Sequence, residues 1–158
     1  MLLALWLLPL FAASGEAQRL RTYEDRYGNT VLAPNGWTKA PDDERWQGSR
    51  LISPDGQAWL AAYAVPHRFR TMDAHIRSLS EVPGERITYI RRGNGWFVTS
   101  GFTSEDRIFY RKAVLVCGGK LWRHIALEYP RSLKRTYDGM VTSISHALIS
   151  TNSGCDRS

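Results

Sequence analysis

The spacing of apolar residues changes several times along the chain. Segments in which apolar and polar residues alternate predict strands. The turn residues Ser53–Pro54–Asp55–Gly56 separate residues 49–52 from residues 57–64. Pro at the second turn position and Gly at the fourth predict a hairpin with a type I turn. Four further apolar segments follow closely: 86–92, 96–102, 107–117 and 120–129. Their connections are so short that neighbouring segments must be antiparallel, which predicts a four-stranded meander.

Apolar residues at helical spacing mark two other segments. Met72, Ile76 and Leu79 share one face of a short helix over 72–80, with Thr71 as its N-cap. A longer helix is predicted over 132–149. Its apolar stripe consists of Leu133, Tyr137, Met140, Val141, Ile144 and Leu148.

These elements predict an α+β sandwich: a mostly antiparallel sheet, made of a hairpin and a four-stranded meander, packed with a short mid-chain helix and a long C-terminal helix. The continuous apolar run 113–117 predicts that the third meander strand lies at the centre of the sheet. Residues 26–34 are interpreted as a turn leading into a short strand. Residues 18–22 are interpreted as a loose lead-in, and residues 34–36 and 40–43 as surface loop.

The first seventeen residues predict export. Their apolar run is too short to span a bilayer but is typical of a secretory signal. Small residues at 15 and 17 favour cleavage before Gln18, and residues 12–14 offer a second cleavage site; the alternative is a buried N-terminal helix. We therefore expect a signal peptide over 1–17, a single domain over 18–158, a periplasmic or secreted location, and no transmembrane segment in the mature protein.

The charge of the chain narrows the choice of partners. Lys and Arg outnumber Asp and Glu by six, and loss of Glu16 with the signal peptide raises the formal net charge from +6 to +7. A basic exported protein associates with anionic envelope material, although the charge could serve solubility alone. Because no run of five or six like charges occurs, a dedicated nucleic-acid arm is not indicated.

Two cysteines, Cys117 and Cys155, are compatible with one disulfide in an oxidising compartment. The alternative is that the polar tail 151–154 never brings Cys155 to Cys117. Cys117 is not expected to be a nucleophile, because the apolar run before it favours burial or pairing. Two distant cysteines without a histidine at ligand spacing do not predict a metal site, and no cofactor is expected.

Several phrases along residues 23–149 resemble a group of small secreted proteins of rhizobia and related alphaproteobacteria. They are Arg26–Tyr27–Gly28–Asn29, Ser53–Pro54–Asp55–Gly56–Gln57–Ala58, Gly95–Trp96–Phe97–Val98–Thr99–Ser100–Gly101, Ile108–Phe109–Tyr110 before Cys117, and Leu127–Glu128–Tyr129–Pro130 before Tyr137–Asp138. The resemblance implies a PsbP-like α/β/α sandwich, a fold that also occurs in a nuclear-transport cofactor. Proteins of this fold act mainly as binding or assembly factors, and no catalytic motif carries over to this chain.

Cations beside aromatic residues form the one pattern that predicts a binding surface. Arg91 and Arg92 precede Trp96, Arg111 follows Tyr110, and Arg123 follows Trp122. In a meander these residues could gather into a patch of guanidinium groups and rings that suits anionic sugars, phosphates or acidic proteins. Alternatively, the two tryptophans belong to the core and the arginines lie on the opposite, solvated face.

These observations favour a non-catalytic, exported binding or envelope-associated protein that recognises an anionic envelope component or an envelope protein. The main alternative is a small periplasmic hydrolase with a spatially assembled histidine site, for which His124 is the first candidate. A third hypothesis is a structural or inhibitory protein that acts by strand addition at a sheet edge, which we expect to be insensitive to salt.

Overall fold

The computed structural model describes residues 19–25, 28–43, 47–148 and 155. The strands are β1 (Leu20–Glu24), β2 (Thr30–Pro34), β3 (Thr38–Lys39), β4 (Gly48–Ile52), β5 (Trp59–Pro66), β6 (Glu85–Gly93), β7 (Trp96–Thr103), β8 (Arg107–Val116) and β9 (Leu121–Pro130). The α-helices are α1 (Met72–Ser80) and α2 (Lys134–Ala147), and 3-10 turns occupy Cys117–Gly119 and Arg131–Leu133. The expected signal peptide lies outside the described residues.

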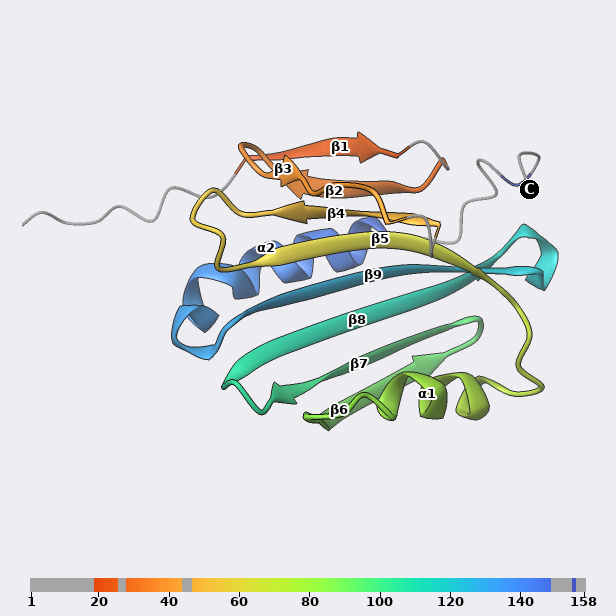
Figure 1. Ribbon diagram of the computed structural model, residues 1–158. Helices are drawn as coiled ribbons and strands as arrows, with labels where there is room; N and C mark the ends of the chain where they lie inside the picture. Colours follow the sequence, from red (N-terminus) through yellow and green to blue (C-terminus); the bar gives the residue numbers. More distant parts are fainter. Residues whose placement is uncertain (1–18, 26–27, 44–46, 149–154, 156–158) are drawn as a thin grey trace, which may run out of the picture.

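Seven strands form one antiparallel sheet in the order β3-β4-β5-β9-β8-β7-β6 (Figure 1). The predicted hairpin is β4–β5, and the predicted meander is β6–β9. Strand β9 joins the two units by pairing with β5 from Trp59↔Glu128 to Pro66↔Leu121. The α+β prediction is confirmed, with β8 and β9 at the centre of the sheet.

Helix α2 covers one face of the sheet, which we call the α2 face. Leu60, Ile125 and Leu127 point from β5 and β9 into this layer and are 0–1 % exposed. The predicted helical stripe meets them through Tyr137, Met140, Val141, Ile144 and Leu148. Strand β2 packs against the same helix, so the small β1–β2 sheet extends this core.

Helix α1 lies on the opposite face, which we call the α1 face (Figure 1). The hydroxyl of Thr71 accepts a hydrogen bond from the Ala74 amide at 3.1 Å, as the sequence predicted for the N-cap. Ile76 packs against Phe97 and Trp122 in a second, smaller core. The sheet is therefore sandwiched between two helices that cover different parts of its width.

Two segments differ from the sequence prediction. The lead-in contains β1, which pairs antiparallel with β2 from Leu20↔Pro34 to Glu24↔Thr30. Only Leu20 and Tyr23 of this strand pack against the core, so its apolar pattern is too sparse to stand out in the sequence. Strand β3, a two-residue strand that pairs with β4, lies between the two predicted loop segments and was not predicted.

A disulfide joins Cys117, directly after β8, to Cys155, with 5.4 Å between their Cα atoms. The expected pairing of the two cysteines is thus present, and it connects the chain beyond α2 to the end of a central strand. Within the described parts of the chain, the helices are too short and too polar to cross a membrane.

Candidate functional site

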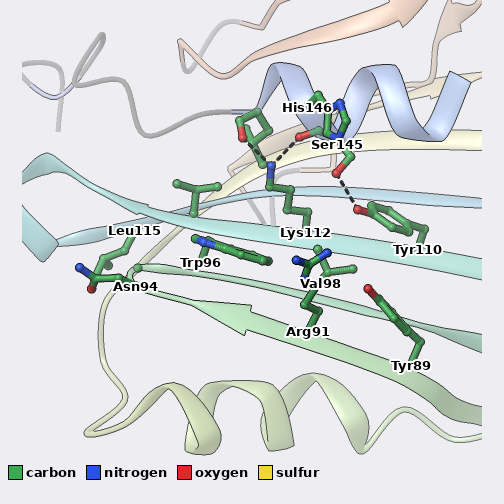
Figure 2. A pocket seen from close by; sticks show the side chains of 13 residues that line it. Tyr89, Arg91, Asn94, Trp96, Val98, Tyr110, Lys112, Leu115, Ser145 and His146 are labelled. Carbon is green, nitrogen blue, oxygen red and sulfur yellow. Dashed lines mark hydrogen bonds between the residues drawn. The ribbon is translucent and has the colours of Figure 1, made fainter.

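The α2 face is open over β6 and β7, because α2 packs against β9 and β8 and does not reach the β6 edge. The open part forms a groove of about 640 Å³ between the C-terminal end of α2 and the β6–β8 strands (Figure 2). Its lining residues are Tyr89, Arg91, Asn94, Gly95, Trp96, Val98, Tyr110, Lys112, Val114, Leu115, Ser145, His146 and Leu148. Most of them come from alternate positions of the three strands, as expected for one face of a sheet.

Three basic side chains converge on this groove from three elements. Arg91 comes from β6, Lys112 from β8 and His146 from the last turn of α2 (Figure 2). Among the described residues that line the groove, none is Asp or Glu. The groove is therefore basic without a neutralising carboxylate in its wall.

Lys112 fixes the position of α2 over the sheet. Its Nζ donates hydrogen bonds to the carbonyl oxygens of Ser145, at 2.5 Å, and Leu148, at 2.8 Å. These carbonyls lie at the C-terminal end of α2, where the helix dipole favours a positive charge. Burial lowers the pKa of Lys112, and the two carbonyls compensate part of the desolvation of its ammonium group.

Aromatic rings supply the remaining walls. Tyr110 Oη lies 2.6 Å from Ser145 Oγ and so joins β8 to α2, while burial raises the pKa of this tyrosine. Trp96 lies flat against Gly93: a Cβ atom at that position would come within 2.2 Å of the indole nitrogen. A side chain at position 93 is therefore incompatible with this orientation of Trp96.

The five residues of the predicted cationic patch do not form one surface. Arg91 and Trp96 line the groove, whereas Arg92 and Arg111 lie on the α1 face. Successive residues of a strand point to opposite faces, so adjacent arginines cannot serve the same surface. Arg123 points to the α2 face beside Val114 but is buried, with 8 % of its surface exposed, and burial lowers its pKa.

The arginines on the α1 face are held by carboxylates. Arg92 forms an exposed ion pair with Asp73 of α1. Arg111 forms a bidentate pair with Glu85, with nitrogen–oxygen distances of 2.6 and 2.7 Å, and its guanidinium lies 4.6 Å from the Phe109 ring centroid. Both cations are engaged by carboxylates and are therefore less available to a ligand than Arg91.

The candidate catalytic histidine is inside the protein. The His124 ring is 1 % exposed and is stacked on Tyr63, with 4.6 Å between ring centroids. His75 packs edge-to-face against it, and Trp122 donates a hydrogen bond to His67 Nδ1 at 2.7 Å. Burial is the main cause that lowers the pKa of His75 to about 4 and that of His124 to about 3. Both rings are therefore neutral members of an aromatic core at physiological pH.

Catalytic and metal-binding arrangements receive no support from this geometry. Neither ring nitrogen of His124 has a hydrogen-bond partner among the described residues, so nothing there orients the ring as a general base. In the part of the chain that the structure describes, no cluster of three His, Cys, Asp or Glu residues has the geometry to hold a metal ion.

Several groove residues were not predicted from the sequence. The alternation of Tyr110 and Lys112 on one predicted strand places them on the same face, but nothing in that pattern distinguishes them from ordinary surface residues. Ser145 and His146 were assigned only to a helix, and their position opposite β8 depends on how α2 packs. Tyr89 carried no signal beyond its place in a predicted strand.

Comparison with known proteins identifies the fold. No protein-family model matches the chain, and no curated protein matches it by sequence. Among solved structures, the cyanobacterial PsbP protein CyanoP of Synechocystis has a TM-score of 0.60 at 14 % identity, and the match covers 88 % of this chain and 96 % of CyanoP. The expected PsbP-like fold is thereby confirmed.

Two further structures share the architecture. LpqN of Mycobacterium tuberculosis, described as involved in cell envelope biogenesis, has a TM-score of 0.53 at 12 % identity, with 84 % of each chain covered. The Ran-binding protein Mog1p of Saccharomyces cerevisiae has a TM-score of 0.52 at 10 % identity, with 89 % of this chain and 88 % of Mog1p covered. At such identities the similarity establishes the fold and leaves function to the site.

Proposed function

We propose that this chain is a non-catalytic binding protein of the cell envelope, and that its groove recognises an anionic envelope component. The observation that carries the proposal is the composition of the groove wall. Arg91, Lys112 and His146 approach from three elements, and the described lining residues include no carboxylate. An anion that enters the groove gains charge-assisted hydrogen bonds without meeting a like charge in the wall.

The aromatic and apolar residues of the groove extend this recognition beyond the charge. Tyr89, Trp96 and Tyr110 provide aromatic rings, and Val98 of β7 and Leu148 at the end of α2 provide apolar contacts. Sites of this kind bind molecules with an anionic group on a ring or hydrocarbon body, because the polar contacts orient the ligand while the apolar walls bury it. Anionic lipid headgroups and acidic glycans meet this description.

An envelope location is supported by three independent observations. The N-terminal sequence has the composition of a secretory signal. The Cys117–Cys155 disulfide suits an oxidising compartment. LpqN, which shares the fold, is described as a protein of envelope biogenesis.

The hydrolase hypothesis is not favoured by any observation in the described structure. His124 is enclosed by Tyr63, His75 and Phe97, so a substrate cannot reach its nitrogens without unfolding this core. In the groove itself, the hydroxyl of Ser145 interacts with Tyr110 and not with His146. A nucleophile oriented by a base, which covalent hydrolysis requires, is not formed there.

The proposal is tested with a pair of adjacent arginines. The mature chain from Gln18, oxidised, is co-sedimented with Gram-negative envelope membranes and with vesicles of phosphatidylglycerol or phosphatidylcholine, at low and high salt. Arg91→Gln removes a groove cation, whereas Arg92→Gln removes a cation from the same strand on the opposite face and is the matched control.

We expect Arg91→Gln to weaken retention by about tenfold, the loss of one charge-assisted contact, and Arg92→Gln to leave it nearly unchanged. High salt should weaken retention of the wild type. Equal loss in both variants would indicate non-specific charge attraction, and no retention on membranes or anionic vesicles would contradict the proposal. Retention on membranes alone would exclude the lipid headgroup and identify a glycan or protein component.

A further inference from the structure

We infer that the β6 edge of the sheet binds an acidic, extended segment of a partner protein as an eighth strand. Strand β6 is nine residues long and terminates the seven-stranded sheet, with β7 as its neighbour on one side. The opposite edge is the two-residue β3. This inference concerns a surface separate from the proposed anion site, although Tyr89 and Arg91 lie where the two surfaces meet.

No strand among the described residues pairs with the outer side of β6, and much of the strand is exposed. Thr88, Tyr89, Ile90, Arg91 and Arg92 are all exposed, five consecutive residues of one strand. Tyr89 and Ile90 are 48 % and 46 % exposed, and they are two of the three exposed large hydrophobic residues in the described chain. An edge strand presents unpaired amide and carbonyl groups, and apolar side chains beside them favour strand addition.

Irregular pairing and a covering helix usually prevent an edge strand from pairing with another chain, but on β6 they affect only part of the strand. The irregularity in its pairing with β7 lies between Ile87 and Tyr89, and pairing is regular from Tyr89 to Gly93. Helix α1 lies on one face of the sheet and is linked to β6 through the Arg92–Asp73 ion pair. Residues 89–93 therefore offer a regular template that a second strand can extend.

The charged residues of β6 favour an acidic partner segment over a second copy of this chain. Arg86, Arg91 and Arg92 all belong to β6. Arg92 is paired with Asp73 of α1, and the acidic residue of the strand, Glu85, is bound to Arg111. A second copy of the strand would add three more arginines to a protein that already has a net charge of +6. A strand with alternating acidic and apolar residues instead can place its carboxylates beside Arg91 on the α2 face and its apolar side chains beside Ile90 on the α1 face. Strand addition at this edge is thus expected to depend on salt, unlike strand addition by backbone bonds alone.

The test uses blocked octapeptides of alternating Glu and Val, with a Lys–Val peptide of the same pattern as the charge control. A third peptide has the Glu–Val sequence with alternate backbone amides methylated, so that it keeps its charge but cannot complete a ladder. Amide hydrogen exchange of the full mature chain is followed by NMR with each peptide. Ile90→Glu, which adds a negative charge on the α1 face away from the groove and so repels an acidic strand, is the edge-blocking variant, and Ile90→Val is its control.

We expect the Glu–Val peptide to slow exchange of the outward amides between Thr88 and Gly93 by about tenfold or more, a range set by the opening free energy of an edge strand. The Lys–Val peptide, the methylated peptide and Ile90→Glu should each abolish this protection, and Ile90→Val should retain it. Equal protection by the methylated peptide would overturn strand addition, because its effect would then be electrostatic. A concentration-dependent dimer that protects the same amides without peptide would also overturn the proposal, in favour of self-pairing. Because membrane retention depends on Arg91 and edge protection on Ile90, either proposal can fail without the other.

Discussion

The two faces of the sheet from β6 to β9, with the helices that cover them, carry the same types of side chain but organise them differently. On the α1 face, Arg111 is bound by Glu85, and His75 and His124 are enclosed among rings. On the α2 face, Arg91 and Lys112 border a groove whose described lining residues lack a carboxylate. The α1 face uses its polar residues to hold the fold together. On the α2 face Lys112 also supports the fold, while Arg91 is left available for an external anion.

This contrast shows that charge alone does not identify a binding surface. Arg91 and Arg92 are adjacent and both exposed, yet Arg92 meets Asp73 of α1 and Arg91 faces the groove. The difference arises from strand alternation together with the helix that covers each face. The four predictions below test it, beginning with the largest expected effect.

Arg111→Gln should destabilise the protein by about 3 to 5 kcal/mol, because it leaves the carboxylate of Glu85 desolvated and without its bidentate partner. The two side chains are only 11 % and 9 % exposed, so water cannot replace the guanidinium efficiently. Urea unfolding measures the effect. Arg131→Gln, which breaks an exposed pair with Asp106, is the control and should cost less than about 1 kcal/mol. A similar loss of unfolding free energy in both variants would show that the buried Arg111–Glu85 pair does not stabilise the α1 face more than an exposed pair does.

Lowering the pH should destabilise the packing on the α1 face at a higher pH than it affects the groove. The pKa of His75 is lowered to about 4 and that of His124 to about 3, from about 6.5 in the unfolded chain. Below pH 6.5 the two histidines are protonated in the unfolded state but stay neutral in the folded state. The free energy of unfolding therefore falls as the pH falls from 6.5 toward the two lowered pKa values. By pH 4 the loss from His75 alone should be about 3 kcal/mol.

Thermal unfolding between pH 7 and pH 4 measures this dependence. His124→Leu removes one of the two buried imidazoles and should flatten the profile. His146→Gln, at an exposed position in the groove, serves as the control and should leave the slope as in the wild type. An unchanged profile in His124→Leu would contradict the assignment of this acid sensitivity to the buried rings.

Lys112→Met should cost about 1 to 2 kcal/mol, because the carbonyls of Ser145 and Leu148 lose a charged donor. The loss should be local: amides in the last turn of α2 should exchange faster with solvent, while those of β9 remain protected. If exchange at the end of α2 stays at the wild-type rate, Lys112 does not hold the helix over the groove and is available to a ligand.

Arg91→Gln and Arg92→Gln should each change the free energy of unfolding by less than about 0.5 kcal/mol, since both side chains are exposed. The membrane-retention comparison of the two variants requires this small effect. Only if both variants are as stable as the wild type can weaker binding by Arg91→Gln be assigned to binding and not to folding. Urea unfolding of both variants provides the measurement. A loss of several kcal/mol in Arg91→Gln would mean that its side chain supports the fold.

Local elements of this fold were predictable to within a few residues. The hairpin, the meander and both helices were predicted from turn residues and from the spacing of apolar residues, which are local properties of the sequence. Strand β1 was missed because its few apolar residues pack against a core assembled from other segments. The binding site was predicted in part: Arg91 and Trp96 belong to the groove, while Arg92, Arg111 and Arg123 do not line it.

The amino-acid sequence by itself determined the α+β class, the position of its turns and helices, the basic charge and the pair of cysteines, because these depend on residues close together in the chain or on composition alone. The tertiary structure decided which cations are free to meet a ligand. Ion pairing of Arg111 with Glu85, 26 residues away, and the approach of Ser145 to Lys112 both depend on long-range packing. Burial, which turns His124 from a candidate base into a neutral core ring, is likewise a property of the assembled sheet and helices.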